Sequence, residues 1–198
     1  GLIGLAGLTG CTLTGGGDLP GSARAWIEGP VRWLVLPDEE RRFRRLESSA
    51  EVLAFIESFW ARRDPDPDTP GNPFVQQFFE RVQEADLLYA GEGRPGSLTD
   101  RGRAYILLGS PSVLRYTQLS APAWDPDGRP RSPTEQLRLE VWGYEREALP
   151  ERLVARLDEE GFELPVEVRF LEERRSTRLI DGEDLLEEAA RAAVREGA

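Results

Sequence analysis

The stretch "GSLTDRGRAYILLGSPSVLRY", Gly96 to Tyr116, decides how the two halves of this chain are joined. Thr99 can cap a helix, because its hydroxyl can accept a backbone N–H of the first turn. Gly109, with a proline two residues later, matches the pattern that stops a helix. We therefore predict a helix over Asp100–Leu108. Gly102 weakens this helix by about 1 kcal/mol relative to Ala, so a strand in the apolar second half remains the alternative.

Three charged residues of this segment could carry chemistry: Asp100, Arg101 and Arg103. A carboxylate can move protons, and a guanidinium can stabilise an oxyanion. The usual catalytic partners are missing, since the chain has no His, no Gly-x-Ser-x-Gly and no phosphate-binding loop. An acid in the first turn of a helix interacts favourably with the helix dipole. We interpret the three as ion-pairing structural residues and assign no catalytic residue.

Before this segment, the chain has the pattern of amphipathic helices. The run Val31–Pro37 is β-prone, and Asp38 after it is a candidate N-cap of a short helix. Ser48 and Glu51 have the spacing of a capping box, and Asn72 followed by proline is an N-cap and first-turn pair. Each of these two caps precedes an apolar stripe at helical spacing: Val52, Phe55, Ile56, Phe59 and Trp60, then Phe74, Phe78, Phe79, Val82, Ala85 and Tyr89.

After the segment, strands dominate. Residues 117–134 are rich in Pro, Asp and Ser and are predicted to be a loop. "LRLEVWGY" alternates like a strand, and "PVEVRFLEE" with "STRLI" predicts an antiparallel hairpin after a short helix in "LPERLVARLDEEG". A closing helix is predicted from Leu185, Leu186, Ala189, Ala190 and Ala193. N-terminal helices, a small antiparallel sheet and a C-terminal helix indicate an α+β fold.

Trp142 and Tyr144 belong to the strand "LRLEVWGY". Trp142 lies on the face opposite Leu139 and Val141, so it must pack under another layer or be exposed at an interface. Aromatic rings of this kind are more often core residues than ligand platforms.

Residues 1–11, "GLIGLAGLTGC", resemble the end of a bacterial lipoprotein signal peptide. Leu8, Thr9 and Gly10 match a lipobox, in which an apolar residue and two small residues precede the cysteine that is acylated. The alternative, a free buried cysteine in a strand, is disfavoured by the glycines on both sides. We predict that Cys11 is the lipid attachment site, and Thr12, in place of Asp, favours the outer membrane.

The chain is divided accordingly into four parts. A signal-peptide remnant, 1–10, is cleaved before the cysteine, and 11–30 forms a flexible tether rich in Gly, Ser and Thr. The α+β domain spans 31–182, and a C-terminal helix spans 183–198.

The composition excludes several classes of function. The formal net charge is −11 and every basic residue is Arg; this charge argues against nucleic-acid binding, which needs a basic face. Without His, the chain lacks Ser-His triads and the commonest metal ligand. A single Cys allows neither an internal disulfide nor a thiolate zinc site. We expect no nucleic-acid partner and no small-molecule cofactor.

Asp64, Asp66 and Asp68 are spaced as D-x-D-x-D, a pattern that makes them candidate metal ligands. A calcium-binding EF-hand needs Gly at its sixth position and an acid at its twelfth, where this chain has Thr69 and Val75. Prolines between the acids also stiffen the backbone. We interpret the stretch as a rigid connector between helices, with calcium binding as the alternative.

Three motifs together resemble the bacterial GWxTD domain family: "FWARRDPDPDTPGNPF" from Phe59, "GSLTDRGRAYILLGSP" from Gly96, and "EVWGY" from Glu140. They follow in the family's order between residues 31 and 180. Two positions depart from the family pattern: Ser97 replaces its tryptophan, and Pro73 replaces the acid after the asparagine. The resemblance implies an exported or lipid-anchored bacterial protein and supplies no catalytic residues.

A more distant, fold-level likeness is to the BamE-type outer-membrane assembly lipoproteins, which also place two helices and a short antiparallel sheet after a lipobox. Together these features predict a non-catalytic interaction module held by its lipid at the periplasmic face of the outer membrane, with an envelope protein as partner. The alternatives are an envelope hydrolase with paired carboxylates and a calcium-responsive connector. The candidate contact residues are Thr99, Asp100, Arg101, Arg103, Trp142 and Tyr144.

Overall fold

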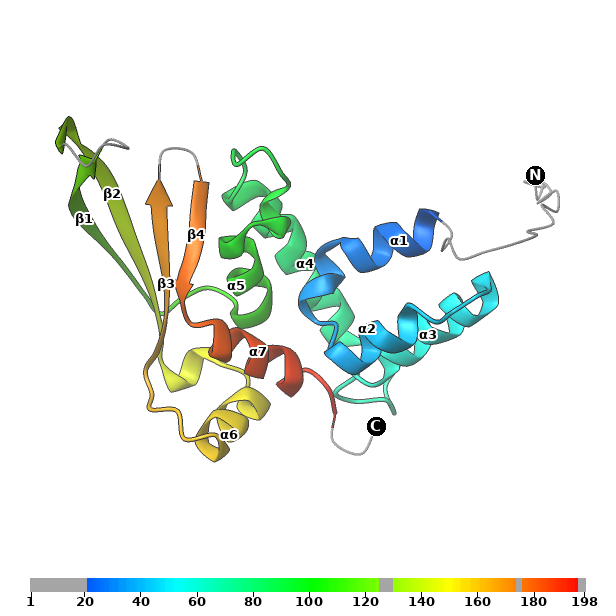
Figure 1. Cartoon of the computed structure of the whole chain (residues 1–198). Coiled ribbons are helices and arrows are strands. Elements are labelled where there is room, and N and C mark those ends of the chain that lie inside the picture. Colours follow the sequence, from blue (N-terminus) through cyan, green and yellow to red (C-terminus); the bar gives the residue numbers. More distant parts are fainter. Residues whose placement is uncertain (1–20, 125–129, 174–175, 196–198) are drawn as a thin grey trace, which may run out of the picture.

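The computed structural model describes residues 21–124, 130–173 and 176–195 and has the predicted α+β architecture (Figure 1). A group of helices lies beside a four-stranded antiparallel sheet of order β1-β2-β3-β4. Cys11, the remnant 1–10 and residues 11–20 of the predicted tether lie outside the described residues. No helix among those described is long and apolar enough to cross a membrane.

The helical half begins inside the segment predicted to be a flexible tether. Residues 21–28 form a helix whose Ala23 is buried, and the ring of Trp26 stacks on Phe43 with centroids 5.5 Å apart. Burial of this apolar surface orders the segment. The elements of the helical half are helix α1 (Gly21–Glu28), the 3₁₀ helix η1 (Pro30–Trp33), and helices α2 (Pro37–Phe43), α3 (Ser49–Ala61) and α4 (Pro73–Leu88).

The β-prone run Val31–Pro37 forms no strand, because it folds into η1 and the entry to α2. A strand needs a partner for its backbone groups, whereas here Leu34 N–H donates to the carbonyl of Val31 at 2.9 Å. Helix α2 is capped two residues earlier than predicted: its N-cap is Leu36, whose N–H donates to Glu39 Oε2 at 2.9 Å.

The predicted caps of α3 and α4 are confirmed. Ser48 Oγ accepts the N–H of Glu51 at 3.2 Å, and the Glu51 carboxylate accepts the N–H of Ser48 at 2.9 Å. Asn72 Oδ1 accepts the N–H of Val75 at 3.2 Å. The apolar faces of both helices pack into one aromatic cluster of Trp26, Phe43, Phe55, Phe59, Trp60 and Phe78.

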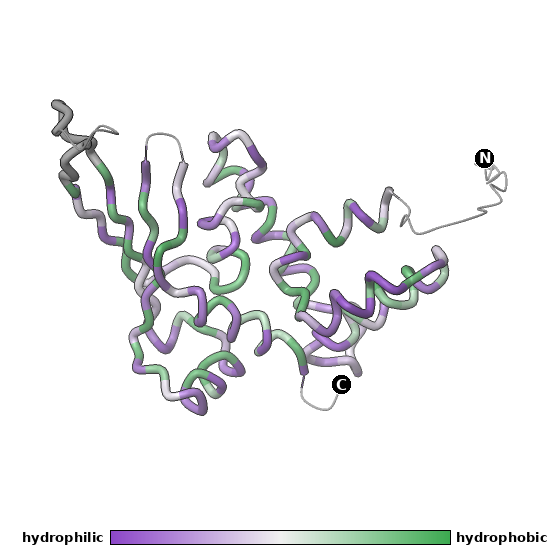
Figure 2. The backbone as a smooth tube through the Cα atoms, in the orientation of Figure 1, coloured by the Kyte–Doolittle hydropathy of each residue, from purple (hydrophilic) through white to green (hydrophobic). Residues whose placement is uncertain are grey.

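The segment Gly96–Tyr116 begins with the 3₁₀ helix η2 (Gly96–Leu98) and helix α5 (Asp100–Leu108). The helix prediction is therefore confirmed and the strand alternative is wrong. Gly109 ends α5 at φ 85°, a conformation that favours glycine. The second half of α5 is buried, and Figure 2 shows its hydrophobic residues in the middle of the molecule.

The sheet is built from two hairpins, β1 (Val113–Trp124) with β2 (Pro130–Tyr144) and β3 (Val166–Glu173) with β4 (Ser176–Asp181). The loop predicted over 117–134 is wrong, because the strand pairing of β1 and β2 continues to Trp124 and Pro130. Pro122 falls at a register shift between Ala121 and Ala123, a position where a strand tolerates proline.

Of the two alternatives for Trp142, the structure shows packing under another layer. Trp142 is 2% exposed and lies on the sheet face that the helices cover. Its ring centroid is 4.9 Å from that of Phe170 on β3 and 5.6 Å from that of Tyr89 at the end of α4. The 3₁₀ helix η3 (Arg146–Ala148) and helix α6 (Glu151–Glu159) connect β2 to β3, and α7 (Glu183–Ala192) closes the fold against α5 and α6.

Candidate functional site

Two glycines, Gly96 and Gly102, allow the backbones of α4, η2 and α5 to lie in direct contact. A Cβ on Gly96 would lie 2.1 Å from the carbonyl oxygen of Ala85 in α4, and a Cβ on Gly102 would lie 2.0 Å from that of Gly96. Real Cβ atoms do not approach so closely, and backbone atoms cannot swing away as the end of a side chain can. Glycine is therefore required where α4, η2 and α5 meet.

Thr99 and Asp100 fix the start of α5. The Thr99 hydroxyl is buried, accepts the N–H of Gly102 at 3.0 Å and donates to the carbonyl of Gly96 at 2.7 Å. Asp100 Oδ2 accepts the N–H of Leu179 in β4 at 2.7 Å. Since β4 is an edge strand of the sheet, this bond provides a partner for an edge N–H group and joins α5 to the sheet.

Arg101 connects α5 to the loop before η2 through Glu92 and to β2 through Glu140. Its Nη2 donates to Glu92 Oε1 at 3.1 Å, and its Nη1 lies 3.5 Å from Glu140 Oε2. Glu140 Oε1 also accepts the indole N–H of Trp142 at 2.7 Å. The guanidinium carbon is 5.3 Å from the ring centroid of Tyr89, within the range of a cation–π contact. The predicted pairing of the segment's arginines with acids is confirmed.

The side chains of Arg103 and Tyr144 also bind other parts of the chain. Arg103 Nη2 lies 2.8 Å from Glu183 Oε1 at the start of α7, and the Tyr144 hydroxyl donates to the carbonyl of Gly109 at 3.2 Å.

The six candidate contact residues are not one exposed surface. Thr99, Trp142 and Tyr144 are at most 2% exposed, so their side chains cannot contact a partner of the folded chain, and that part of the prediction needs correction. Asp100, Arg101 and Arg103 keep side-chain exposures of 32%, 19% and 18%.

Alkaline pH is expected to destabilise the fold through its buried tyrosines. Burial raises the pKa of Tyr144 and of Tyr89 above the ordinary value of 10.0. Above pH 10 the unfolded chain therefore loses protons that the folded chain retains, and stability falls by up to about 1.4 kcal/mol per pH unit for a buried tyrosine. Urea unfolding between pH 8 and 11 should show this slope, and Tyr144→Phe should reduce it; an unchanged slope would contradict this assignment.

The three aspartates of the connector do not converge on a metal site. Among the described residues, no group of three or more His, Cys, Asp or Glu side chains could hold a metal ion. Asp64 Oδ1 instead accepts the N–H of Asp66 at 3.1 Å, and Thr69 Oγ1 donates to the carbonyl of Asp66 at 3.0 Å. These bonds tighten the turns between α3 and α4.

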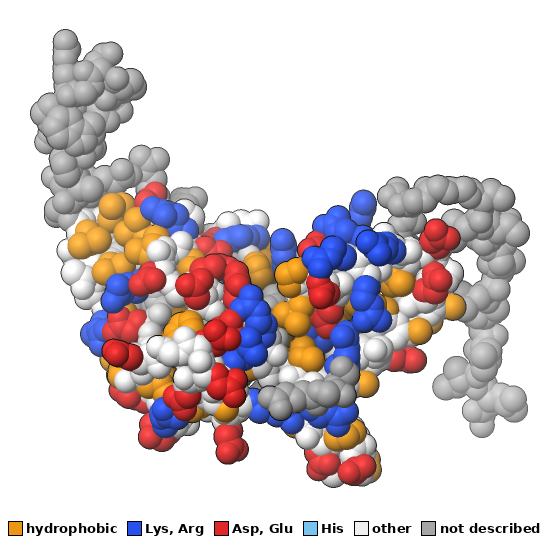
Figure 3. Space-filling view, turned by 60° about the horizontal axis from the view of Figure 1, so that its bottom comes forward, with side chains coloured by type: hydrophobic (Ala, Val, Ile, Leu, Met, Phe, Trp, Pro, Cys, Tyr) orange, Lys and Arg blue, Asp and Glu red, His pale blue; other side chains and the backbone are white. Residues whose placement is uncertain are grey.

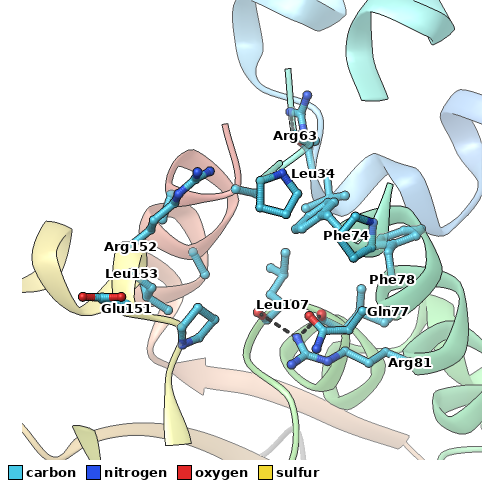
Figure 4. Close-up of a pocket in the computed structure, with 17 residues that line it drawn as sticks. Leu34, Arg63, Phe74, Gln77, Phe78, Arg81, Leu107, Glu151, Arg152 and Leu153 are labelled. Atoms are coloured by element: carbon cyan, nitrogen blue, oxygen red, sulfur yellow. Dashed lines mark hydrogen bonds between the residues drawn. The ribbon is translucent and has the colours of Figure 1, made fainter. Parts of the chain in front are cut away.

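A pocket of about 400 Å³ lies where the helical half meets α6 and α7 (Figure 4). Helices α4, α5, α6 and α7 all contribute to its lining, as does the connector between α3 and α4. Seen from the lower side in Figure 3, hydrophobic side chains between the two halves are bordered by arginines. Apolar lining residues are Leu34, Phe74, Phe78, Leu107, Leu153 and Ala189.

Arg81 is the polar residue at one side of this pocket. Its Nη1 donates to the carbonyls of Ile106 and Leu107 at 3.1 and 3.5 Å, at the C-terminal end of α5. Desolvation lowers the pKa of Arg81, and the nearby Tyr105, Tyr144 and Glu84 oppose this shift. Sequence analysis missed Arg81, although it lies three residues after Phe78 and thus on the inward side of α4.

The comparisons with known proteins give one match. The model of the GWxTD domain matches residues 25–125, just over half of the chain. The chain belongs to the GWxTD domain family. No curated protein and no solved structure matches it, so the likeness to BamE-type lipoproteins stays a prediction.

The GWxTD segment of this chain is Gly96–Asp100, with Ser97 at the tryptophan position. Ser97 is 2% exposed. Its carbonyl accepts the indole N–H of Trp33 at 2.8 Å, and its own N–H donates to Asp86 Oδ1 at 2.8 Å. The position is thus held through backbone groups, which a serine supplies as well as a tryptophan does.

Proposed function

We propose that this GWxTD protein is an exported, lipid-anchored bacterial protein whose α+β domain is a non-catalytic interaction module at the cell envelope. The observation that carries the proposal is the use of the GWxTD segment: Thr99 caps α5, Asp100 binds β4 and Arg101 binds two carboxylates. Polar groups that are bound to other parts of the chain in this way hold the fold together. The lipobox before Cys11 supports the lipid anchor. The proposed location is the periplasmic face of the outer membrane.

The proposed contact surface lies beside Arg101, on the first hairpin. Tyr116 pairs across the strands with Glu140, and Leu114 pairs with Trp142. Tyr116 and Leu114 therefore lie on the same sheet face as Glu140, the carboxylate that pairs with Arg101. Leu114 and Tyr116 are 47% and 52% exposed. Exposed aromatic and apolar residues next to arginine are typical of the centre of an interface. Strand β1 is also an edge strand, to which a partner can add a strand.

This surface is tested by replacing single residues with a photo-crosslinking amino acid in intact cells. A probe at Tyr116 is expected to give a discrete crosslinked envelope protein. The matched control is Leu53 on α3, which is 61% exposed and lies far from the hairpin in sequence. Equal crosslinking from both positions, or none from Tyr116, would contradict the proposed surface.

The anchor is tested separately by Cys11→Ser. With acyl chains on Cys11, the protein should partition into the detergent phase, because two or more chains give stable membrane attachment. The serine variant should move to the aqueous phase while keeping the circular dichroism spectrum of the wild type. Equal partitioning of the two proteins would rule out lipidation.

A glycan hydrolase with paired carboxylates gains no support from the geometry. Such an enzyme holds two carboxyl groups about 5 to 9.5 Å apart across a cleft. Glu92 and Glu140 lie near each other, but Arg101 bridges them. The buried Glu39 and Glu188 are paired with Arg63 and with Arg156 in separate places.

A further inference from the structure

We propose that the pocket between α4, α5, α6 and α7 binds a single-chain amphiphile, an apolar chain that ends in one carboxylate or phosphate group. A volume of about 400 Å³ lies within the range of small-molecule sites, about 300 to 1,000 Å³. The apolar side chains described above form its walls, and such walls favour an apolar chain over a sugar or a nucleotide.

The first support for an anionic head group is Arg81. Its Nη1 is used by two backbone carbonyls, and it forms no salt bridge with any described carboxylate. Its Nε and Nη2 have no acceptor in the described chain and are not among the fully buried unpaired atoms. Figure 4 shows the guanidinium at the floor of the pocket, near Gln77 and Leu107. A cation in this position has two donor nitrogens left for a ligand.

The second support is the start of α6, which lines the opposite side of the pocket. Its N-cap is Pro150, which gives no side-chain cap, so the first N–H groups of this nine-residue helix have no capping partner. Such an end attracts anions through its free donors and the helix dipole. Arg152 stands in this first turn, is exposed, lines the edge of the pocket and makes no ion pair among the described residues (Figure 4).

The remaining charged residues of the lining do not cancel these cations. Arg63 is bound to Glu39 through two hydrogen bonds of 2.8 and 3.0 Å. Glu151 is exposed, and in Figure 4 its carboxylate points away from the pocket. The pocket therefore combines apolar walls with two arginines that form no ion pair among the described residues, which selects an anionic amphiphile over a neutral or cationic one.

The experiment is calorimetric titration of the full chain carrying Cys11→Ser, so that no detergent competes for the site. Three ligands with the same chain, used below their micelle concentrations, are decanoate, decyl phosphate and decyltrimethylammonium. Both anions should bind, and the cation should bind at least about tenfold more weakly, since a charged hydrogen bond contributes roughly 1.5–3 kcal/mol. The tighter of the two anions identifies the head group as a carboxylate or as a lipid-type phosphate.

Two variants locate the binding in this pocket. Arg152→Ala should weaken decanoate binding several-fold and leave the fold unchanged, because the side chain is exposed and makes no ion pair among the described residues. Its matched control is Arg45→Ala, an exposed arginine outside the lining, which should bind like the parent. Ala193→Phe fills the pocket and should abolish binding.

Equal affinity for the anions and the cation would overturn the proposal, and so would unchanged binding in Ala193→Phe or no binding of any ligand. If Ala193→Phe is unfolded by circular dichroism, Arg152→Glu decides the question in its place. This charge reversal should cost more affinity than Arg152→Ala, and equal affinities of Arg152→Glu and the parent would overturn the assignment. Neither result bears on the anchor or on the hairpin surface.

Discussion

Gly102→Ala is expected to lower the free energy of unfolding by about 3 kcal/mol or more, at the upper end of what overpacking costs. The added methyl would lie 2.0 Å from the carbonyl oxygen of Gly96 and 3.0 Å from the Cα of Ser97. Both are backbone atoms of η2, so either α5 or η2 must move. Helix propensity alone predicts the opposite sign, because Ala is favoured over Gly by about 1 kcal/mol inside a helix.

The matched control is Gly21→Ala, at the first residue of α1. A Cβ there meets nothing within 4 Å, so this variant should be neutral or slightly stabilised. Urea unfolding of both variants, followed by circular dichroism, gives the comparison. A Gly102→Ala protein as stable as the wild type would mean that α4, η2 and α5 do not pack as closely as described.

Glu39→Ala is expected to cost about 3 to 5 kcal/mol, because it leaves a buried guanidinium without its carboxylate. The side chains of Arg63 and Glu39 are 0% and 3% exposed. Burial lowers the pKa of Arg63, and the hydrogen bonds and charge of Glu39 oppose that shift. Arg63 also donates to the carbonyls of Leu34 and Phe59, so losing its counter-ion would disturb the junction of η1, α2 and α3.

The neighbouring Glu40→Ala controls for helix and charge effects. Glu40 pairs with Arg44 on the exposed face of α2, and exposed pairs of this kind contribute about 0.3–0.5 kcal/mol. Thermal unfolding should therefore separate the two variants clearly. Similar losses of stability in both would show that the buried pair has no special role.

Local signals in the sequence predicted helices α3, α4 and α5 well, whereas α1 was expected to be part of a flexible tether. The capping box of Ser48 and Glu51, the Asn72 cap and the Thr99 cap each require only residues three apart, so a short window contains the whole signal. The alternation in "PVEVRFLEE" was sufficient for β3, because its apolar residues do face the helices.

The failures came where distant parts of the chain decide the structure. Val31–Pro37 has the composition of a strand, yet no strand lies beside it to accept its hydrogen bonds. In β2 the alternation did not show which face the helices cover. Glu140 and Trp142 lie on that face, where Arg101 pairs with Glu140 and the Tyr89 ring packs on Trp142. The pocket could not be predicted, because its lining comes from segments far apart in the sequence, from Leu34 to Ala193.

The central claim, that the GWxTD segment joins the helical half to the sheet, is tested most directly by hydrogen exchange at one amide. The N–H of Leu179 donates to Asp100 Oδ2 at 2.7 Å. Asp100→Asn keeps an acceptor oxygen and Asp100→Leu removes it. We predict a slowly exchanging Leu179 amide in the wild type and in Asp100→Asn, and exchange at least about tenfold faster in Asp100→Leu, which corresponds to losing roughly 1.4 kcal/mol or more of local stability. Equal exchange rates in all three proteins would contradict the claim.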